Sequence, residues 1–142
     1  MLRCIAIDDE PLALRQIESY IRRESELELV ALCCSAKEAQ EVLQSEKIDL
    51  MFVDINMPDL SGVEFVRSLE KAPMIIFTTA YSEYAVESFR LDAIDYLLKP
   101  FPYEDFSHAV KKAISLAELI SMKAKSTEGE ASLAREDKNL ST

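Results

Sequence analysis

The chain alternates short apolar runs with segments of helical periodicity, and this alternation limits its fold more than any other feature. The five runs are Leu2–Ile7, Leu27–Cys34, Leu50–Val53, Met74–Phe77 and Ile94–Leu98. Several are nearly continuous, without intervening polar residues, which is typical of parallel strands buried on both faces. The alternation predicts an α/β fold, a doubly wound three-layer sandwich around a parallel sheet.

Local signals mark the helices between these runs. Pro11 suits the first position of a helix. Ser35 and Ser61 are each followed three residues later by glutamate, the pattern of a capping box. We expect the helix after Ser35 to end near Ser45, and a further helix to span Ser82–Leu91.

The last helix has the clearest pattern. Its apolar residues recur on a 3.6-residue period at Phe106, Ala109, Val110, Ala113, Ile114, Ala117 and Ile120. Beyond Met122 the sequence has too little apolar surface to offset the entropy of ordering. We therefore assign residues 1–122 to one domain and residues 123–142 to a linker or disordered tail.

Composition excludes several classes of function. The formal net charge of −10 and the lack of a Lys/Arg cluster argue against nucleic-acid binding by this segment. With only Gly62 and Gly129, the chain cannot contain a dinucleotide-binding glycine fingerprint or a Walker phosphate loop. No apolar run is long enough to span a membrane.

The cysteines point to a reducing compartment. Cys4, Cys33 and Cys34 are odd in number and lack C-x-x-C spacing, which argues against a disulfide framework or a structural zinc site. Each lies in an apolar run, where cysteine packs as a small hydrophobe. We expect a cytoplasmic protein.

Polar side chains end four of the five predicted strands. Asp8 and Asp9 follow the first strand, Asp54 the third, Thr79 the fourth and Lys99 the fifth. The carboxyl ends of parallel strands meet at one edge of a sheet, so we expect these groups to converge there. Three carboxylates repel one another unless a cation joins them, and Mg²⁺ is a hard cation that prefers oxygen ligands. Such a site is suited to phosphoryl transfer, with Asp54 as the nucleophile.

Each signal alone has a simpler interpretation. Asp8 and Asp9 could be an acidic first helical turn, Asp54 a turn former and Lys99 an ordinary loop residue. Their joint placement at separate strand ends favours a functional site.

Four motifs in this order resemble the receiver domain of two-component response regulators. They are IAIDDEP (residues 5–11), FVDINMPDLSG (52–62), IIFTTAY (75–81) and DYLLKPF (95–101), and the resemblance covers residues 1 to about 122. The segments TTAYSEYAVESF and FRLDAIDYLLKPF further resemble receivers that precede a LytTR-type (LytR/AlgR-like) DNA-binding domain. The resemblance implies a flavodoxin-like (βα)5 fold with strand order 2-1-3-4-5.

The resemblance also implies a metal site and a phosphoacceptor. Asp54 matches the residue that receives the phosphoryl group. Asp9 and Asp54 match direct ligands of Mg²⁺, Asp8 a ligand that acts through water, and Asn56 a ligand that uses its backbone carbonyl.

Further positions match residues that contact or respond to the phosphoryl group. Thr79 and Lys99 match its contacts, and Thr79 and Tyr96 match the switch residues. Asn56 and Tyr81 match positions that tune dephosphorylation, and the bond from Lys99 to Pro100 is typically cis in such domains.

The function implied is a phosphorylation-dependent signalling switch. A sensor histidine kinase would donate the phosphoryl group to Asp54, and the domain would catalyse only its own phosphorylation and dephosphorylation. The expected output is homodimerisation, with the last-helix side as the interface, or contact with a DNA-binding effector domain in transcription regulation.

Two other functions stay open. A Mg²⁺-dependent phosphohydrolase could use the same aspartate, but such enzymes usually carry an acid where this chain has Asn56, and the sequence has no cap domain. A flavodoxin-like cofactor binder would need a phosphate-cradling loop that this sequence lacks.

Overall fold

A five-stranded parallel sheet forms the middle layer of the computed structural model, which describes residues 1–58, 60–80 and 93–137, the last fourteen by backbone alone. The strands are β1 (Leu2–Ile7), β2 (Leu27–Cys33), β3 (Leu50–Asp54), β4 (Met74–Thr79) and β5 (Asp95–Leu98). They pair in the order β2-β1-β3-β4-β5, and every pair is parallel. The predicted fold class and strand order are confirmed.

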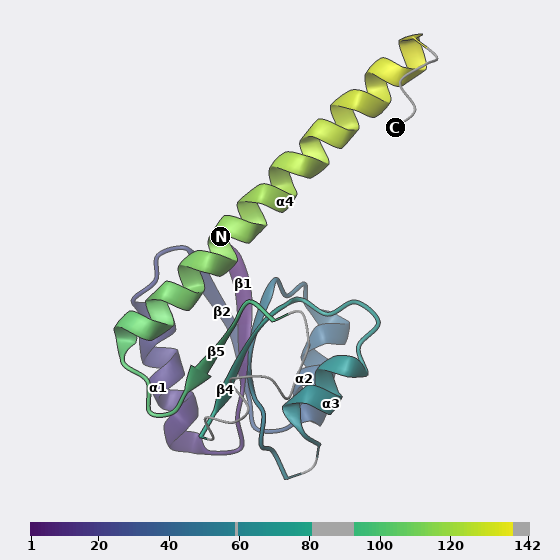
Figure 1. The fold of residues 1–142 in the computed structure, drawn as a ribbon. Helices are drawn as coiled ribbons and strands as arrows, with labels where there is room; N and C mark the ends of the chain where they lie inside the picture. Colours follow the sequence, from purple (N-terminus) through teal and green to yellow (C-terminus); the bar gives the residue numbers. More distant parts are fainter. Residues whose placement is uncertain (59, 81–92, 138–142) are drawn as a thin grey trace.

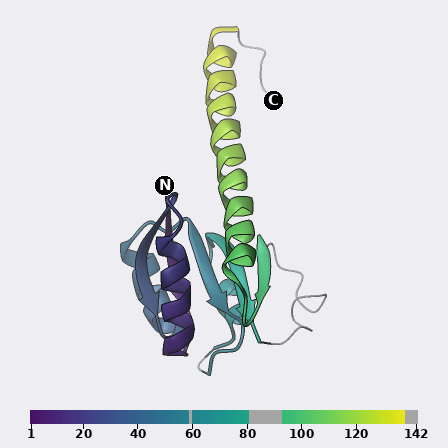
Figure 2. The ribbon, with the colours of Figure 1, turned by 90° about the vertical axis from the view of Figure 1, so that its left-hand side faces the viewer.

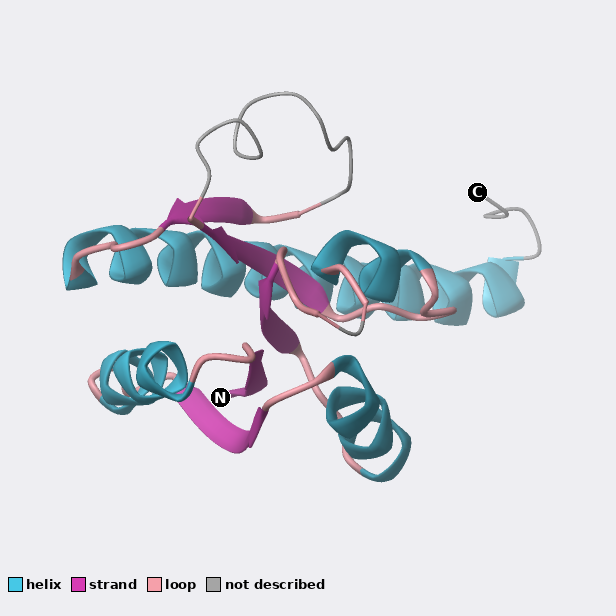
Figure 3. Ribbon diagram, turned by 90° about the horizontal axis from the view of Figure 1, so that it is seen from below, coloured by secondary structure: helices cyan, strands magenta, loops and turns pink. Residues whose placement is uncertain are grey.

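Helices cover both faces of this sheet (Figure 1). Helices α1 (Pro11–Arg22) and α4 (Tyr103–Asp137) lie on one face, and α2 (Ala36–Ser45) and α3 (Gly62–Arg67) lie on the other. Figure 3 shows the three layers from below. The predicted helix Ser82–Leu91 lies outside the described residues.

Burial on both faces explains why the sequence of the central strand, β3, is almost continuously apolar. All five residues of β3 are buried. Leu50 and Phe52 belong to the core under α1 and α4, whereas Met51 and Val53 belong to the core under α2 and α3. Each fully buried apolar side chain contributes about 1.5–3 kcal/mol relative to an exposed one. A strand that is buried on both faces therefore lacks the alternation of polar and apolar residues.

The helices begin where the capping signals predict. Pro11 is the first residue of α1. The Ser35 hydroxyl accepts a hydrogen bond from the Glu38 backbone N–H at 3.2 Å, and the Ser61 hydroxyl accepts one from the Glu64 N–H at 3.1 Å. These side chains satisfy amides that have no partner within the helix.

Helix α4 is longer than the sequence predicts, and its apolar stripe is buried over only part of its length. Phe106, Ala109, Val110 and Ala113 are fully buried, but Ile120 is 56% exposed. The stripe is therefore apolar over its whole predicted length but covered only in its first part, and the far part of α4 runs past the end of the sheet (Figure 2).

The described backbone of the tail is helical through Asp137. Apolar periodicity reports packing, whereas the tail is rich in Ala, Lys and Glu, which favour helix without a packing partner. A helix can also serve as a linker, so the division at residue 122 stays a prediction.

Two of the three cysteines pack as predicted. Cys4 and Cys33 are buried, while Cys34 is exposed at the end of β2, against the prediction. Burial raises the pKa of Cys4 to about 12 and that of Cys33 to about 11, so both stay protonated thiols. Within the described part of the chain, no helix combines the length and the apolar character that a membrane span requires.

Gly62 allows α3 to approach the end of β3. Its N–H donates to the Ile55 carbonyl at 2.8 Å. A Cβ atom at this position would overlap the Asp54 carbonyl oxygen and would lie 2.9 Å from Val53 Cγ1. The close approach of two backbones requires glycine here.

We expect Gly62→Ala to lower the free energy of unfolding by about 1–3 kcal/mol, because backbone atoms must move to admit the methyl group. Urea denaturation would measure this change. Arg67→Ala, an exposed substitution on the same helix, should stay within about 0.5 kcal/mol of the unsubstituted chain. Equal stability of the two variants would contradict the prediction.

Candidate functional site

Three aspartates bring their carboxylates together at the carboxyl edge of the sheet. Asp8 and Asp9 follow β1, and Asp54 is the last residue of β3, the neighbouring strand. One carboxylate oxygen from each lies within 4.8 Å of the others. Asp8 and Asp54 are buried, while Asp9 is exposed. The strand order is what joins these residues, because it places β1 directly beside β3.

Lys99 supplies a positive charge to this group. Its Nζ atom donates to Asp8 Oδ2 at 2.7 Å and lies 3.6 Å from Asp54 Oδ2. The Lys99 side chain is only 18% exposed. The Lys99 backbone N–H donates to the Thr79 carbonyl at 2.7 Å, and the bond from Lys99 to Pro100 is cis, as the resemblance implies.

Local backbone bonds hold the two buried carboxylates. Asp8 Oδ1 accepts from the Glu10 N–H at 2.9 Å, and Asp54 Oδ1 accepts from the Asn56 N–H at 3.2 Å. Aspartate readily makes such a bond to the backbone two residues further on. The orientation of each carboxylate is therefore set by the turn that follows its own strand.

The environment of Asp54 disfavours its ionised form. Burial raises the pKa of Asp54 from 3.8 to about 7, and the negative charge of Asp8 adds to this rise. The Lys99 charge and the Asn56 N–H act in the opposite direction. One ammonium group therefore does not compensate the buried negative charge.

The environment of Lys99, in contrast to that of Asp54, favours the ionised form of the side chain. Burial alone would lower the pKa of Lys99, but the hydrogen bond to Asp8 and the charges of Asp54 and Asp8 raise it above its usual value. The amine therefore stays a cation throughout the neutral range.

The donor atoms fit a magnesium ion. All three convergent side chains offer carboxylate oxygens, the ligand type that Mg²⁺ prefers, and the ion commonly keeps several waters beside one or two carboxylates. Burial, and secondarily the charge of Asp8, raises the pKa of Asp54, and a divalent cation beside it would favour the ionised form.

The other predicted residues lie around this group. Thr79 is buried at the end of β4, where its carbonyl holds the Lys99 backbone. Asn56 is exposed two residues after Asp54. Tyr96 is partly buried and packs against the core under α2 and α3, with its ring stacked on Phe77 at 5.5 Å. Tyr81 lies outside the described residues.

A cavity opens beside Lys99. It measures about 340 Å³ and is lined by Glu10, Ala13, Gln16, Ile17, Ala80, Lys99, Pro100 and Phe101. It lies between α1 and the segment that follows β5, and Lys99 is the residue that it shares with the site.

Sequence reasoning assigned no role to Glu10 or Gly62. The position of Glu10 beside the two aspartates was a visible signal, and its charge contributes to the raised pKa of Lys99. Gly62 was visible as one of only two glycines in the chain. Its importance depends on how closely α3 approaches β3, which no local pattern reveals.

Comparison with known proteins agrees with this geometry. The family model of the response regulator receiver domain matches residues 4–111. The chain belongs to this family. It is therefore a receiver domain of a two-component response regulator, a signalling domain rather than an enzyme of the usual kind.

Individual relatives support the assignment. The sensory transduction protein LytT of Enterococcus faecalis is 36% identical over 115 residues, which cover 79% of this chain and 48% of LytT. This similarity places the receiver among those of the LytTR type, as predicted. The chain spans about half the length of the curated relatives it matches.

Two solved structures share the fold. The response regulatory domain of mrkE from Klebsiella pneumoniae has a TM-score of 0.74 and 33% identity, with coverage of 83% of this chain and 99% of that one. TrrA from Thermotoga maritima, solved in complex with Mg(2+)-BeF, has a TM-score of 0.69 and 31% identity, with coverage of 80% and 99%.

The raised pKa of Asp54 predicts a pH-dependent stability in metal-free protein. Between the unfolded pKa of 3.8 and the folded pKa of about 7, the folded chain holds a proton that the unfolded chain releases. Folding therefore becomes less favourable as pH rises through this window, and the loss is complete above it. We expect the free energy of unfolding of Asp54→Asn to gain roughly 4 kcal/mol over that of the wild type on going from about pH 4 to about pH 8.

Urea denaturation with a chelator present would measure this difference. For Asp105→Asn, which changes an exposed carboxylate, the difference in free energy of unfolding from the wild type should not grow comparably with pH. A difference in free energy of unfolding between Asp54→Asn and the wild type that stays constant with pH would contradict the prediction.

Proposed function

We propose that Asp54 is the phosphoacceptor of this receiver and takes its phosphoryl group from a sensor histidine kinase. The observation that carries the proposal is the position of its carboxylate, buried at a strand end, 3.6 Å from the Lys99 ammonium and grouped with the oxygens of Asp8 and Asp9. Membership of the receiver family supports the same role.

The transfer uses a simple exchange of bonds. A carboxylate oxygen of Asp54 attacks the phosphorus atom as the bond from phosphorus to the imidazole nitrogen of the donor breaks, which leaves an acyl phosphate on Asp54. Lys99 stabilises the negative charge on the phosphoryl oxygens, and the Thr79 hydroxyl donates a hydrogen bond to one of them.

The convergent oxygens would hold Mg²⁺. Asp9 and Asp54 would bind it directly, Asp8 through water and Asn56 through its backbone carbonyl. When bound, the ion supplies positive charge that offsets the charge on the phosphoryl group. The TrrA relative was solved with Mg(2+)-BeF, and three carboxylates lie close enough in this chain to share one ion.

Phosphorylation would bias the domain between two conformations. The phosphoryl group adds about −1.5 to −2 charge units beside Lys99 and draws the Thr79 hydroxyl toward it. We propose that Tyr96 then becomes more deeply buried, since its ring already packs on Phe77. A ligand shifts such an equilibrium only by its different affinity for the two states.

The output would be homodimerisation or contact with an effector domain. The chain spans about half the length of its curated relatives, and the LytTR-type resemblance implies a DNA-binding effector. The distal part of α4 supports a role as the interface, because Leu116, Leu119, Ile120 and Met122 are exposed there. Exposed apolar patches commonly mark interaction sites.

Mass spectrometry after incubation with acetyl phosphate and Mg²⁺ would test the phosphoacceptor. We expect the intact protein to gain one phosphoryl group, and Asp54→Asn or a chelator to abolish the gain, because the substitution removes the nucleophile and chelation removes the ion. Asp105→Asn, with its carboxylate outside the site, should gain the group like the wild type. An adduct that persists in Asp54→Asn would place the nucleophile elsewhere.

A second sample, with a small phosphoester and Mg²⁺, distinguishes the phosphohydrolase alternative. Such an enzyme would release phosphate continuously from the ester, whereas we expect the receiver to leave the ester intact. The amide of Asn56 cannot readily donate the proton that a leaving alkoxide needs. Continuous turnover by the purified chain would favour the enzyme.

Beryllofluoride would test the proposed dimer. With Mg²⁺ it mimics the phosphoryl group, so we expect it to raise the dimer fraction in analytical ultracentrifugation. Leu119→Ser should weaken the response, because it places a hydroxyl in the exposed apolar patch, while the exposed Leu12→Ser on α1 should not. An unchanged sedimentation coefficient would contradict dimerisation on phosphorylation.

A further inference from the structure

Among the described residues, the segment that carries Lys99 makes few backbone hydrogen bonds. It runs from Lys99 to Pro102 between β5 and α4, and two of its four residues are prolines, which have no N–H to donate. At its start, the Lys99 N–H donates to the Thr79 carbonyl. At its end, the Pro102 carbonyl accepts from the backbone of Asp105 and Phe106 in α4. Side-chain contacts must therefore hold the middle of the segment.

A tyrosine of α1 supplies such a contact. The Tyr20 hydroxyl donates to the Phe101 carbonyl at 3.1 Å, across 81 positions of sequence. The Gln16 amide donates to the same hydroxyl at 3.5 Å. Both partners of the Tyr20 hydroxyl, Gln16 and Phe101, also line the cavity beside Lys99.

Aromatic packing reinforces the contact. The Tyr20 ring centroid lies 6.1 Å from Phe101, 5.5 Å from Tyr103 and 5.4 Å from Phe106. Phe101 and Phe106 are buried. Ring pairs of this kind contribute about 0.5–1.5 kcal/mol each beyond their buried area. Helix α1 and the segment therefore pack as one unit.

The position of α1 links this contact to the carboxylates. The helix begins at Pro11, two residues after Asp9, so its amino end is joined directly to the aspartates. Tyr20 then ties the other end of α1 to the residues that follow Lys99. The Lys99 backbone is thus held from β4 through Thr79 and from α1 through Phe101.

We propose that Tyr20 is a positioning residue for Lys99, whose hydroxyl anchors the Phe101 carbonyl and so keeps the ammonium between Asp8 and Asp54. The proposal rests on the function proposed above, because it gives Tyr20 a part in phosphoryl transfer. A small displacement of a group that stabilises transferring charge can cost a large factor in rate.

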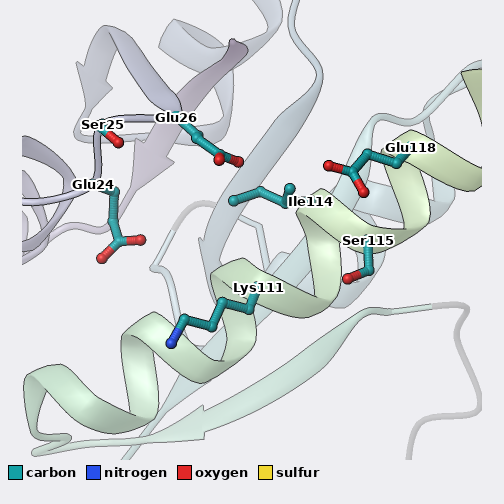
Figure 4. Close-up of a pocket in the computed structure, with 7 residues that line it drawn as sticks. All are labelled: Glu24, Ser25, Glu26, Lys111, Ile114, Ser115 and Glu118. Atoms are coloured by element: carbon teal, nitrogen blue, oxygen red, sulfur yellow. The ribbon is translucent and has the colours of Figure 1, made fainter.

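Tyr103 provides a matched control within the same cluster. Its hydroxyl donates to the Glu24 carboxylate, and the Arg23 guanidinium lies 3.7 Å above its ring. Glu24 lines a separate cavity of about 380 Å³ between the turn after α1 and the outer face of α4, with Lys111 on the opposite wall (Figure 4). Removing this hydroxyl therefore perturbs the α1–α4 contact on a side that Lys99 does not share.

The test compares Tyr20→Phe and Tyr103→Phe, each of which removes one phenolic oxygen and keeps the ring. The rate of phosphorylation by acetyl phosphate is measured by intact-protein mass spectrometry over a range of Mg²⁺ concentrations. We expect Tyr20→Phe to lower the rate at saturating Mg²⁺ about 3- to 10-fold. The Mg²⁺ concentration for half-maximal rate should stay within about twofold, because Asp8, Asp9 and Asp54 are unchanged. Tyr103→Phe should change both quantities less than about twofold.

The outcomes separate this proposal from the function on which it rests. If the wild-type chain gains no phosphoryl group, the proposed function fails, and the role of Tyr20 fails with it. If the wild type is phosphorylated but Tyr20→Phe matches Tyr103→Phe, only the role of Tyr20 is overturned. The role of Tyr20 is also overturned if Tyr20→Phe raises the Mg²⁺ concentration for half-maximal rate by as large a factor as it lowers the rate. The same holds if circular dichroism shows that Tyr20→Phe does not fold, because the hydroxyl would then serve the fold as a whole.

Discussion

The buried negative charge of Asp8 and Asp54 is the constraint on which the rest of the site depends. These two carboxylates are buried at the carboxyl edge of the sheet, and both lie close to the ammonium group of Lys99. Burial, together with the charge of Asp8, raises the pKa of Asp54 although Lys99 lies beside it. Burial of charge without full pairing is costly, so the site gains free energy from any added cation. The same imbalance that strains the metal-free protein makes the site responsive to a divalent ion.

The sheet topology makes this arrangement possible. Strand β1 lies beside β3, and β4 lies beside β5, so residues from opposite ends of the chain meet at one edge. Backbone bonds then set the details: the Thr79 carbonyl holds Lys99, and Gly62 lets α3 lie against the end of β3. Main-chain contacts of the strands position the carboxylates and the start of the Lys99 segment, and the Tyr20 hydroxyl adds a side-chain contact to that segment.

Helix α4 connects the site to the surface that would carry an output. Its first turns pack against the sheet through Phe106, whose ring stacks on Phe52 at 5.1 Å. Its distal half extends past the sheet (Figure 2). Ile120 in α4 is exposed. The helix also receives the segment that bears Lys99 at its amino end. A change in the position of Lys99 therefore acts on the start of the element whose far end is free to contact another surface.

Local sequence determined the strands, the capped helix starts at Ser35 and Ser61, and which strand ends carry aspartate or lysine, because burial patterns and capping act over a few residues. The strand order came from the family resemblance, whereas the placement of polar residues at strand ends already predicted a site with Asp54 as the nucleophile and Lys99 nearby. Tertiary structure alone decided that Tyr20 bonds the Phe101 carbonyl and that Ile120 is exposed. The first depends on how α1 meets a segment 81 positions away, and the second on where the sheet ends beneath α4. Periodicity shows which face of a helix is apolar, but only the packed neighbours determine how much of that face is covered.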